Sequence, residues 1–330
     1  MIFYPDPIEP FFVFDDASEP TVAMVEKILE EERAKGLQHQ ARILFSGHPP
    51  KNRTGKLNAM IAGYREARHE LIAFIDSDMR QTPASLKMLV ETLLEDDKAG
   101  SSFPPVSSSS PPLTAGDVGY ALMVNGLYEP AALATAHANQ GGLPFIMGHL
   151  MVLRREAIEA IGGLETAEGQ LVDDMYLGRR MVEEGYRNKI APTAVDIVQQ
   201  GTSTDEFVQI LIRWIAFSMS GLPLFPTKIQ HALTGIAFWI GLLISLWLGV
   251  EGHYWLALAA LGVPVSVNWI INDLHFRWTG NPIPLRYSWV SSAIWLGAPL
   301  IYFQIFTRRE VNWRGRRYRI NARSKLHHTA

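Results

Sequence analysis

The chain has 330 residues, a formal net charge of −3 and no cysteine. The length allows one large domain or two modest ones, the charge gives no reason to expect a nucleic-acid partner, and the absence of cysteine excludes disulfides, thiolate metal sites and cysteine nucleophiles. Charged residues make up only 19% of the chain and hydrophobic residues 48%, a balance that indicates membrane-embedded segments.

The first 200 or so residues alternate short apolar runs with amphipathic stretches. We expect strands over 11–16, 41–47 and 71–79, and helices over 19–36, 55–69 and 82–96. Thr82 is a suitable cap for the third helix, with Pro83 at its first position. Such alternation predicts an α/β domain with a mainly parallel sheet covered by helices, in which ligands bind beyond the carboxyl ends of the strands.

Two of the apolar runs end in pairs of carboxylates. Asp15 and Asp16 close the first run, and Asp76 and Asp78 follow the run "LIAFI". In a parallel sheet these four side chains share one edge, where oxygen ligands can carry a divalent cation together with water and substrate phosphates. The alternative is that they are solvated turn residues.

A third acidic pair lies between residues 157 and 187. This stretch reads as a helix stopped by Gly162 and Gly163, a flexible loop, and a second amphipathic helix that begins with Asp173 and Asp174. The helix dipole alone favours acids in a first turn. A carboxylate at this junction can instead take a proton from an attacking hydroxyl.

The C-terminal third contains three apolar segments. They span 232–250, 254–271 and 289–306 and are about long enough to cross a bilayer core of roughly 30 Å; a buried core helix is the alternative for any one of them. Trp255, Trp269 and Trp289 fit an interfacial aromatic belt. We therefore expect an integral membrane protein. No cleavable signal peptide is evident at the start.

The order of these motifs resembles that of the ceramide glucosyltransferases and their bacterial relatives. The sequence contains Asp16-x-x-Glu-Pro, "DSDM", "GGL…VDDMYL", "RW" and "NWRGRRYRI" in that order, across about residues 11–320. The resemblance implies a membrane-bound, inverting glycosyltransferase with an A-type fold and C-terminal transmembrane helices. It also implies a nucleotide-sugar donor, UDP-glucose, and a membrane lipid acceptor such as ceramide.

The resemblance also assigns roles to the acidic residues. Asp16, or alternatively Asp15, contacts the nucleoside, and Asp76 and Asp78 serve the ribose and the metal-diphosphate. Asp174 is the base that deprotonates the acceptor hydroxyl. The cofactor is then Mn²⁺ or Mg²⁺ bound by Asp78, which neutralises the departing diphosphate in a single displacement.

Some positions depart from the family pattern. The motif expected as Gln/Arg-x-x-Arg-Trp has Arg213 and Trp214, but Ile210 occupies its first position and Gln209 lies one residue earlier. Gln209 still shares a helical face with Arg213; Arg213 and Trp214 could instead be interfacial anchors. The family's N-terminal anchor and first strand are missing, so either the true start lies upstream or the nucleotide pocket is incomplete. A non-catalytic membrane protein with a degraded domain and a polysaccharide synthase are the alternatives.

We divide the chain into a catalytic domain (1–205), an amphipathic interfacial region (206–229), a transmembrane region (230–307) and a basic tail (308–330). The tail suits anionic lipid headgroups or the donor's diphosphate. His137 and His149 are interpreted as structural, and 104–112 as a flexible loop.

The expected location is a multi-pass position in the bacterial inner membrane rather than the Golgi or ER, with the catalytic domain cytosolic. Basic residues favour the cytosolic side, so the tail should be cytosolic and one of the three apolar segments re-entrant or interfacial. The segment from Tyr254 is the weakest, because Pro264, Asn268 and Asn272 interrupt it.

Overall fold

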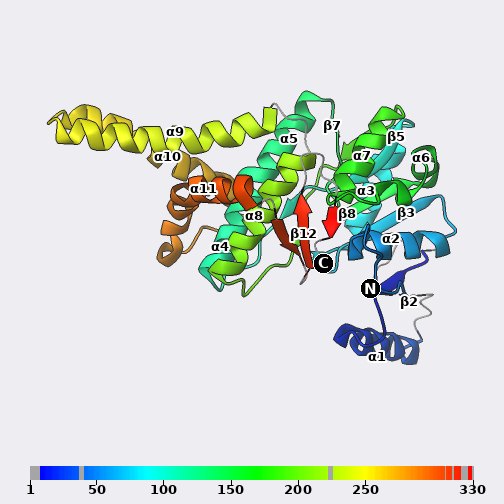
Figure 1. Ribbon diagram of the computed structural model, residues 1–330. Helices are drawn as coiled ribbons and strands as arrows, with labels where there is room; N and C mark the ends of the chain where they lie inside the picture. The colour runs from blue at the N-terminus through cyan, green and yellow to red at the C-terminus, as the bar shows by residue number, and fades with distance from the viewer. Residues whose placement is uncertain are drawn as a thin grey trace.

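The computed structural model describes residues 8–36, 41–221, 226–308, 310–313, 316–320 and 326–328. Figure 1 shows an α/β body from which two long helices, α9 and α10, project together. The strands of the body are β1 (Phe11–Phe14), β2 (Arg42–Phe45), β3 (Leu71–Ile75), β4 (Met79–Arg80), β5 (Ala99–Phe103), β6 (Val106–Ser107), β7 (Gly142–Leu143), β8 (Leu150–Arg154), β9 (Arg187–Ile190) and β10 (Val195–Ile197).

Five of the seven helices described in the body follow predicted stretches, and the two over 115–123 and 129–138 were not predicted. The seven helices are α1 (Pro20–Ala34), α2 (Gly55–Glu66), α3 (Pro83–Leu94), α4 (Ala115–Met123), α5 (Glu129–Ala138), α6 (Arg155–Ala160) and α7 (Asp173–Glu183), with a π-helical turn η1 (Val124–Tyr128) and a 3-10 turn η2 (Leu164–Ala167). The predicted cap of α3 is confirmed: Thr82 accepts a hydrogen bond from the Ser85 backbone N–H, and Pro83 opens the helix.

The main sheet is mixed, so the expectation of a mainly parallel sheet is wrong. Its five strands lie in the order β3-β8-β5-β9-β7, and β5–β9 is the one parallel pairing that the structure describes within it. β8 is inserted antiparallel between β3 and β5. Because β5 and β8 are buried on both faces, they read in the sequence as continuous apolar or small residues, a pattern that does not encode strand direction.

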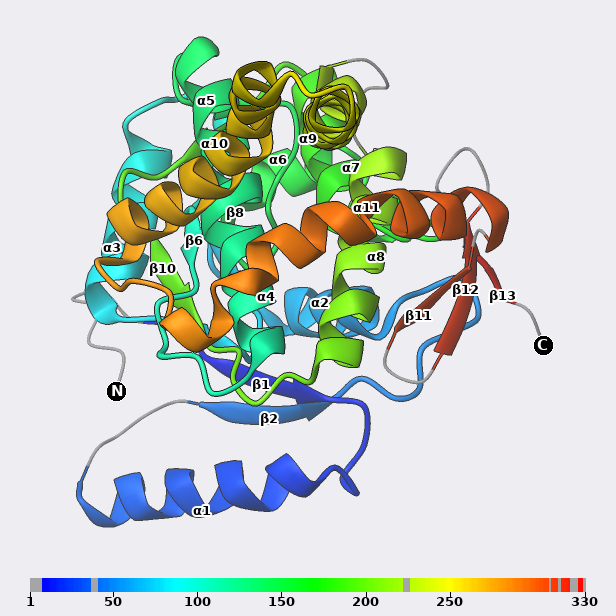
Figure 2. The same cartoon turned by 90° about the vertical axis from the view of Figure 1, so that its left-hand side faces the viewer.

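The first predicted strand does not join this sheet. β1 pairs with β2 in a separate parallel ribbon, and β3 forms an edge of the main sheet. Residues 10–14 and 70–76 instead face the same cavity. The four carboxylates expected on one sheet edge are therefore divided between two sheets. Figure 2 shows the ribbon lying below the body, with α1 beyond it.

The serine-rich stretch 104–112, expected to be a flexible loop, is mostly buried and ordered by hydrogen bonds. It contains β6, which pairs with β10. Buried Asn125 of η1 accepts from the Ser108 N–H at 3.0 Å and donates to the Ser108 carbonyl at 2.9 Å. The Ser109 hydroxyl donates to Asp196 at 2.7 Å. Side-chain bonding of this kind is not visible in composition.

Four further helices follow the body: α8 (Thr204–Gly221), α9 (Pro226–Val250), α10 (Tyr254–Thr279) and α11 (Trp289–Arg308), with a 3-10 turn η3 (Leu285–Tyr287) before α11. Among the described residues, one helix, α10, is long and apolar enough to cross a membrane, with a mean hydropathy of 1.6 over a window that is 11% buried. Residues 236–250 of α9 form a shorter apolar helix.

The segment from Tyr254 was expected to be interrupted, but α10 is continuous over 26 residues. The polar side chains that suggested a break bond within the helix. Asn268 donates to the Pro264 carbonyl at 3.0 Å, and Asn272 donates to the Asn268 carbonyl at 2.7 Å. These bonds give the two asparagine amides partners inside the apolar helix, so the helix need not be interrupted at these residues.

The chain ends in a small antiparallel sheet of β11 (Glu310–Trp313), β12 (Arg316–Ile320) and β13 (Leu326–His328). The side chains of the predicted basic tail, and residues 309, 314–315, 321–325 and 329–330 entirely, lie outside the described residues. Its contacts with lipid or diphosphate stay a prediction.

Candidate active site

One large cavity, of about 1840 Å³, gathers most of the predicted site residues. It is lined by Asp76 and Asp78 after β3, by Asp174 at the start of α7, and by Arg213 and Trp214 on α8. These residues come from three segments that are spread over more than 130 positions of the chain. The fold therefore brings the two acidic motifs and the Arg-Trp pair to one place.

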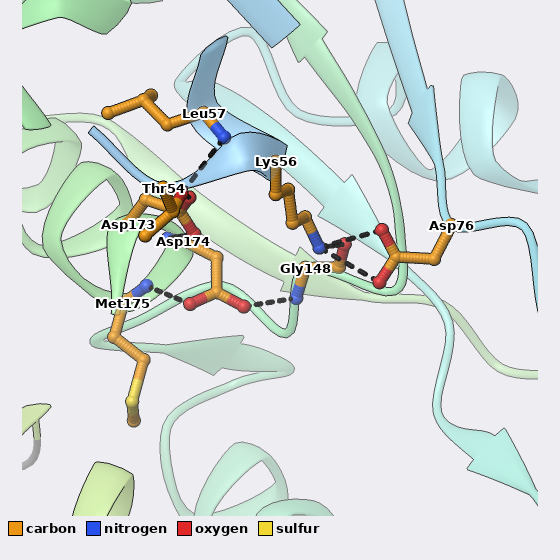
Figure 3. Close-up of polar contacts among 8 residues, drawn as sticks. All are labelled: Thr54, Lys56, Leu57, Asp76, Gly148, Asp173, Asp174 and Met175. Carbon is orange, nitrogen blue, oxygen red and sulfur yellow. Dashed lines mark hydrogen bonds and ion pairs between the residues drawn. The ribbon is translucent and has the colours of Figure 1, made fainter. Parts of the chain in front are cut away.

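Lys56 occupies the space between the two acidic motifs (Figure 3). It lies in the first turn of α2, which Thr54 caps by accepting from the Leu57 N–H at 3.0 Å. The Lys56 Nζ lies 2.8 Å from Asp76 Oδ1 and 2.9 Å from Oδ2, and it donates to the Gly148 carbonyl at 2.6 Å.

Burial opposes the charge of Lys56, but the nearby carboxylates of Asp76, Asp173 and Asp174 outweigh it and raise the pKa of the ammonium. Lys56 is therefore a fixed positive charge. Sequence reasoning did not select it. The available signal was a lysine in the first turn of a predicted helix, where the helix dipole disfavours a cation.

Asp174 is oriented by two backbone groups. Its Oδ2 accepts from the Gly148 N–H at 2.8 Å, and its Oδ1 accepts from the Met175 N–H at 2.7 Å. A Cβ on Gly148 would lie 2.4 Å from Asp174 Oδ2, so only glycine permits this approach. The Gly148 peptide thus joins the two motifs: its N–H holds Asp174, and its carbonyl holds Lys56, which holds Asp76 (Figure 3).

Asp173 is directed toward α2. It is buried, accepts from the Thr54 hydroxyl at 3.1 Å and accepts from the Asp174 N–H at 2.9 Å. Burial, and then the charge of Asp174, raise the pKa of Asp173 to about 6. The two neighbouring acids therefore differ: Asp173 bonds to the helix-capping threonine, and Asp174 to the Gly148 peptide.

Trp214 lies in an aromatic cluster that lines the same cavity. Its ring centroid lies 5.1 Å from that of Tyr128, 5.5 Å from that of His149 and 6.3 Å from that of Tyr120. The Nδ1 of His149 is buried and has no hydrogen-bond partner. Burial lowers the pKa of His149, and so does the charge of Lys56, against the opposite effect of the nearby carboxylates.

Glu129, which follows Tyr128 in the chain, is a buried acid that sequence reasoning missed. Its side chain lines the cavity region and is only 1% exposed, and its Oε2 has no hydrogen-bond partner. Burial raises the pKa of Glu129 to about 8, although a hydrogen bond from the Val106 backbone opposes the shift. The only sequence signal was an acid inside the otherwise uncharged run 118–136.

Asp78 is the residue best suited to a cation. Its Oδ1 is buried without a hydrogen-bond partner, whereas both oxygens of Asp76 face Lys56. Within the described ranges, no group of three or more His, Cys, Asp or Glu residues could hold a metal ion. A cation here would therefore take one or two protein oxygens and depend on phosphate and water for the rest, as Mg²⁺ commonly does.

Asp16, its alternative Asp15, and Gln209 do not line the cavity. Asp16 bonds to the Ser18 N–H at 2.7 Å, lies 3.9 Å from His48 Nε2, and has a side chain 45% exposed; the bonds from Ser18 lower the pKa of Asp16. Gln209 is exposed on α8, while the adjacent Ile210 lines the cavity. The shifted glutamine therefore points away from the site.

The chain is similar in sequence to known glycosyltransferases. The family described as glycosyl transferase family 21 matches residues 4–326. Ceramide glucosyltransferases 3 and 1 of Caenorhabditis elegans are each 20% identical to the chain, over 326 and 328 residues, which is 93% and 95% of this chain. The chain spans 65% of the length of each of these relatives.

Two other similarities are weaker. The probable glycosyltransferase YdaM of Bacillus subtilis (strain 168) is 23% identical over 223 residues, 64% of this chain and 48% of YdaM. The mannosyltransferase PcManGT from Pyrobaculum calidifontis, solved in complex with GDP-Man and Mn²⁺, is 18% identical, covers 90% of this chain and 72% of its own, and superposes with a TM-score of 0.39.

Proposed function

This chain belongs to glycosyl transferase family 21, and from that premise we propose that it transfers glucose from UDP-glucose to a membrane lipid such as ceramide. The family membership makes it a glycosyltransferase, and the mixed α/β body is in keeping with an A-type fold. The two glucosyltransferase relatives supply the sugar and lipid class as a hypothesis.

The main support for the proposal is that Asp78 and Asp174 line one cavity but have different surroundings. Asp78 presents a buried oxygen without a partner, which suits a cation-bound diphosphate. Asp174 is held by two backbone N–H groups and needs no protein side chain to orient it. A donor site and a base are the two parts that a single displacement requires.

In the proposed mechanism the donor diphosphate lies beside Asp78, and a Mn²⁺ or Mg²⁺ ion there would neutralise its growing charge. Lys56 stays charged between the motifs and fixes Asp76. Asp174 accepts the proton of the acceptor hydroxyl as that oxygen attacks the anomeric carbon. The bond from this carbon to the diphosphate oxygen breaks as the new bond forms, so UDP leaves, the carbon is inverted and no covalent bond to the protein is made.

The lipid acceptor is supported by the projecting helix α10. Its far end is exposed and apolar, and its other end contacts the body, where Trp278 Nε1 donates to the Val106 carbonyl at 3.3 Å. We propose a multi-pass protein of the bacterial inner membrane with the body (1–205) cytosolic, followed by an interfacial region (206–229), the membrane region (230–307) and the tail (308–330).

A second candidate is a non-catalytic membrane protein with a degraded glycosyltransferase domain. It is favoured by the positions of Asp16 and Gln209, which lie off the cavity, and by the separation of β1 from β3.

Activity in vesicles distinguishes the two. The purified chain, in phosphatidylcholine vesicles containing ceramide, is supplied with UDP-glucose and Mn²⁺, and the lipid extract is analysed by mass spectrometry for hexosylceramide. We expect product from the wild-type chain and from Asp205→Asn, an exposed acid on α8. Asp174→Asn should bind UDP normally and give no product. Normal UDP binding without product from the wild-type chain would favour the non-catalytic candidate.

A further inference from the structure

The segment of His149 contacts both acidic motifs and the Trp214 ring of α8. The His149 backbone carbonyl accepts from the Asp76 N–H at 2.8 Å, which ties it to the end of β3. The preceding residue, Gly148, bonds to both Lys56 and Asp174. On the other side, the His149 ring lies 5.5 Å from the Trp214 ring at an interplanar angle of 37°.

The His149 side chain is surrounded by the groups assigned to the reaction. It lines the cavity, and the carboxylates of Asp76, Asp174 and Asp78 are all close enough for their charges to act on the ring. Its Nδ1 is buried without a hydrogen-bond partner. Buried polar atoms in folded proteins nearly always have partners, so an unpaired one inside a cavity indicates a ligand group.

The chemistry of a single displacement indicates which part of the donor lies beside the His149 ring. The transferred sugar must lie between the diphosphate, on the Asp78 side, and the base, Asp174. The His149 ring lines the same cavity as these two acids and lies within reach of both of their charges. On the basis of the proposed function, we infer that His149 binds a hydroxyl group of the transferred hexose, with the Trp214 ring packing beside the sugar.

The residue types suit a hexose. A neutral imidazole offers one donor and one acceptor nitrogen, which matches a hydroxyl group that both donates and accepts. An aromatic face such as that of Trp214 packs well against the apolar C–H groups of a sugar. The base Asp174 does not need to contact the sugar, because its proton comes from the acceptor.

The test compares UDP with UDP-glucose, which differ only by the sugar. Calorimetric titration with Mn²⁺ measures both affinities for the wild-type chain and for His149→Phe, which keeps a ring against Trp214 and removes both nitrogens. We expect His149→Phe to bind UDP as the wild type does and to bind UDP-glucose about tenfold more weakly, the loss expected for one buried hydrogen bond. His149→Gln, which restores a donor and an acceptor, should recover part of that affinity.

His137→Ala, a change at an exposed histidine on α5, is the matched control and should change neither affinity. Equal weakening of UDP and UDP-glucose by His149→Phe would overturn the inference in favour of a nucleotide or structural role. If His149→Phe binds UDP-glucose as tightly as the wild type does, the inference is overturned, and the His149 ring contributes by packing alone. If the wild-type chain binds neither nucleotide, the proposed function fails, and this inference fails with it.

Discussion

Asp76 and Asp78 look equivalent in the sequence, but their surroundings separate them. Lys56 neutralises both oxygens of Asp76 at 2.8 and 2.9 Å, and Asp78 keeps one buried oxygen without a partner. The sequence motif predicts that acidic residues lie together at the end of β3. It does not identify the lysine, because the contact joins residues twenty positions apart on different elements, and only the fold brings α2 to the end of β3.

A first prediction concerns the cation. Asp78→Asn should leave the fold intact, because Asp78 Oδ1 has no bond to lose, and should weaken Mn²⁺-dependent UDP binding by about tenfold or more, since the amide removes the charge that the cation needs. Titration of UDP with and without Mn²⁺ measures this. Asp96→Asn, an acid on the far side of the sheet that bonds to Arg187, is the control. An unchanged Mn²⁺ dependence in Asp78→Asn would exclude Asp78 as a ligand.

A second prediction concerns the pH dependence of stability. Burial raises the pKa of Glu129 from its ordinary value of 4.5 to about 8, so between these pH values the folded chain holds a proton that the unfolded chain has released. The free energy of unfolding therefore decreases as the pH rises through this window, by at most about 1.4 kcal/mol per pH unit. Glu129→Gln, which cannot ionise, should flatten this dependence.

Chemical unfolding in detergent at about pH 5, 6, 7 and 8 measures the effect. Glu159→Gln changes an exposed acid on α6 and should keep the wild-type slope. An equal slope in Glu129→Gln and the wild type would mean that Glu129 is ionised in the folded chain.

At the scale of elements, the sequence predicts the start of a helix correctly but does not predict which strands pair or in which direction. Thr82 and Pro83 start α3 as expected, since a cap is set by neighbouring residues. Strand direction depends on distant segments: residues 150–154 enter the sheet antiparallel to β3, and nothing in an apolar run specifies that. The same limit applies to 104–112, where buried hydrogen bonds to η1 order a stretch whose composition suggests flexibility.

A third prediction concerns the peptide that joins the acidic elements. Gly148→Ala places a Cβ 2.4 Å from Asp174 Oδ2, so α7 or the carboxylate must move. We expect at least a tenfold loss of transfer rate with UDP affinity retained, because misplacing the proposed base Asp174 affects the chemical step rather than donor binding. Gly55→Ala, in open space on α2, is the control and should keep the rate. A wild-type rate for Gly148→Ala would show that this bond does not position the base.

At the scale of the whole molecule, the apolar helices have two different relations to the body. α9 and α10 lie along each other and project from it (Figure 1); the Ser245 hydroxyl of α9 donates to the Ala257 carbonyl of α10 at 2.8 Å. α11 instead runs across α4 and α8 (Figure 2), where Val290 and Trp295 share a buried cluster with Val118. The sequence shows three similar apolar segments, and the distinction arises from packing.

The final prediction follows from this arrangement. A helix of 26 residues is about 39 Å long, enough for a hydrocarbon core of roughly 30 Å. The C-terminal end of α10 is fixed to the body, because Asn281 bonds to the Ser109 carbonyl at 3.3 Å and Tyr287 to the Leu113 carbonyl at 2.8 Å. The turn at 251–253 lies at the opposite end and contains no lysine or arginine, as expected for a non-cytosolic loop.

Because the chain has no cysteine, single cysteines report each side without background. His253→Cys and Pro282→Cys are both exposed positions. In intact vesicles of cytosolic-side-in orientation, a membrane-impermeant maleimide should label His253→Cys, and it should label Pro282→Cys only after the vesicles are opened. Equal labelling of both from one side would mean that α10 lies along the membrane surface. In the crossing arrangement α9 and α10 form a hairpin that returns to the body, so α11 and the tail remain on the cytosolic side without a third crossing.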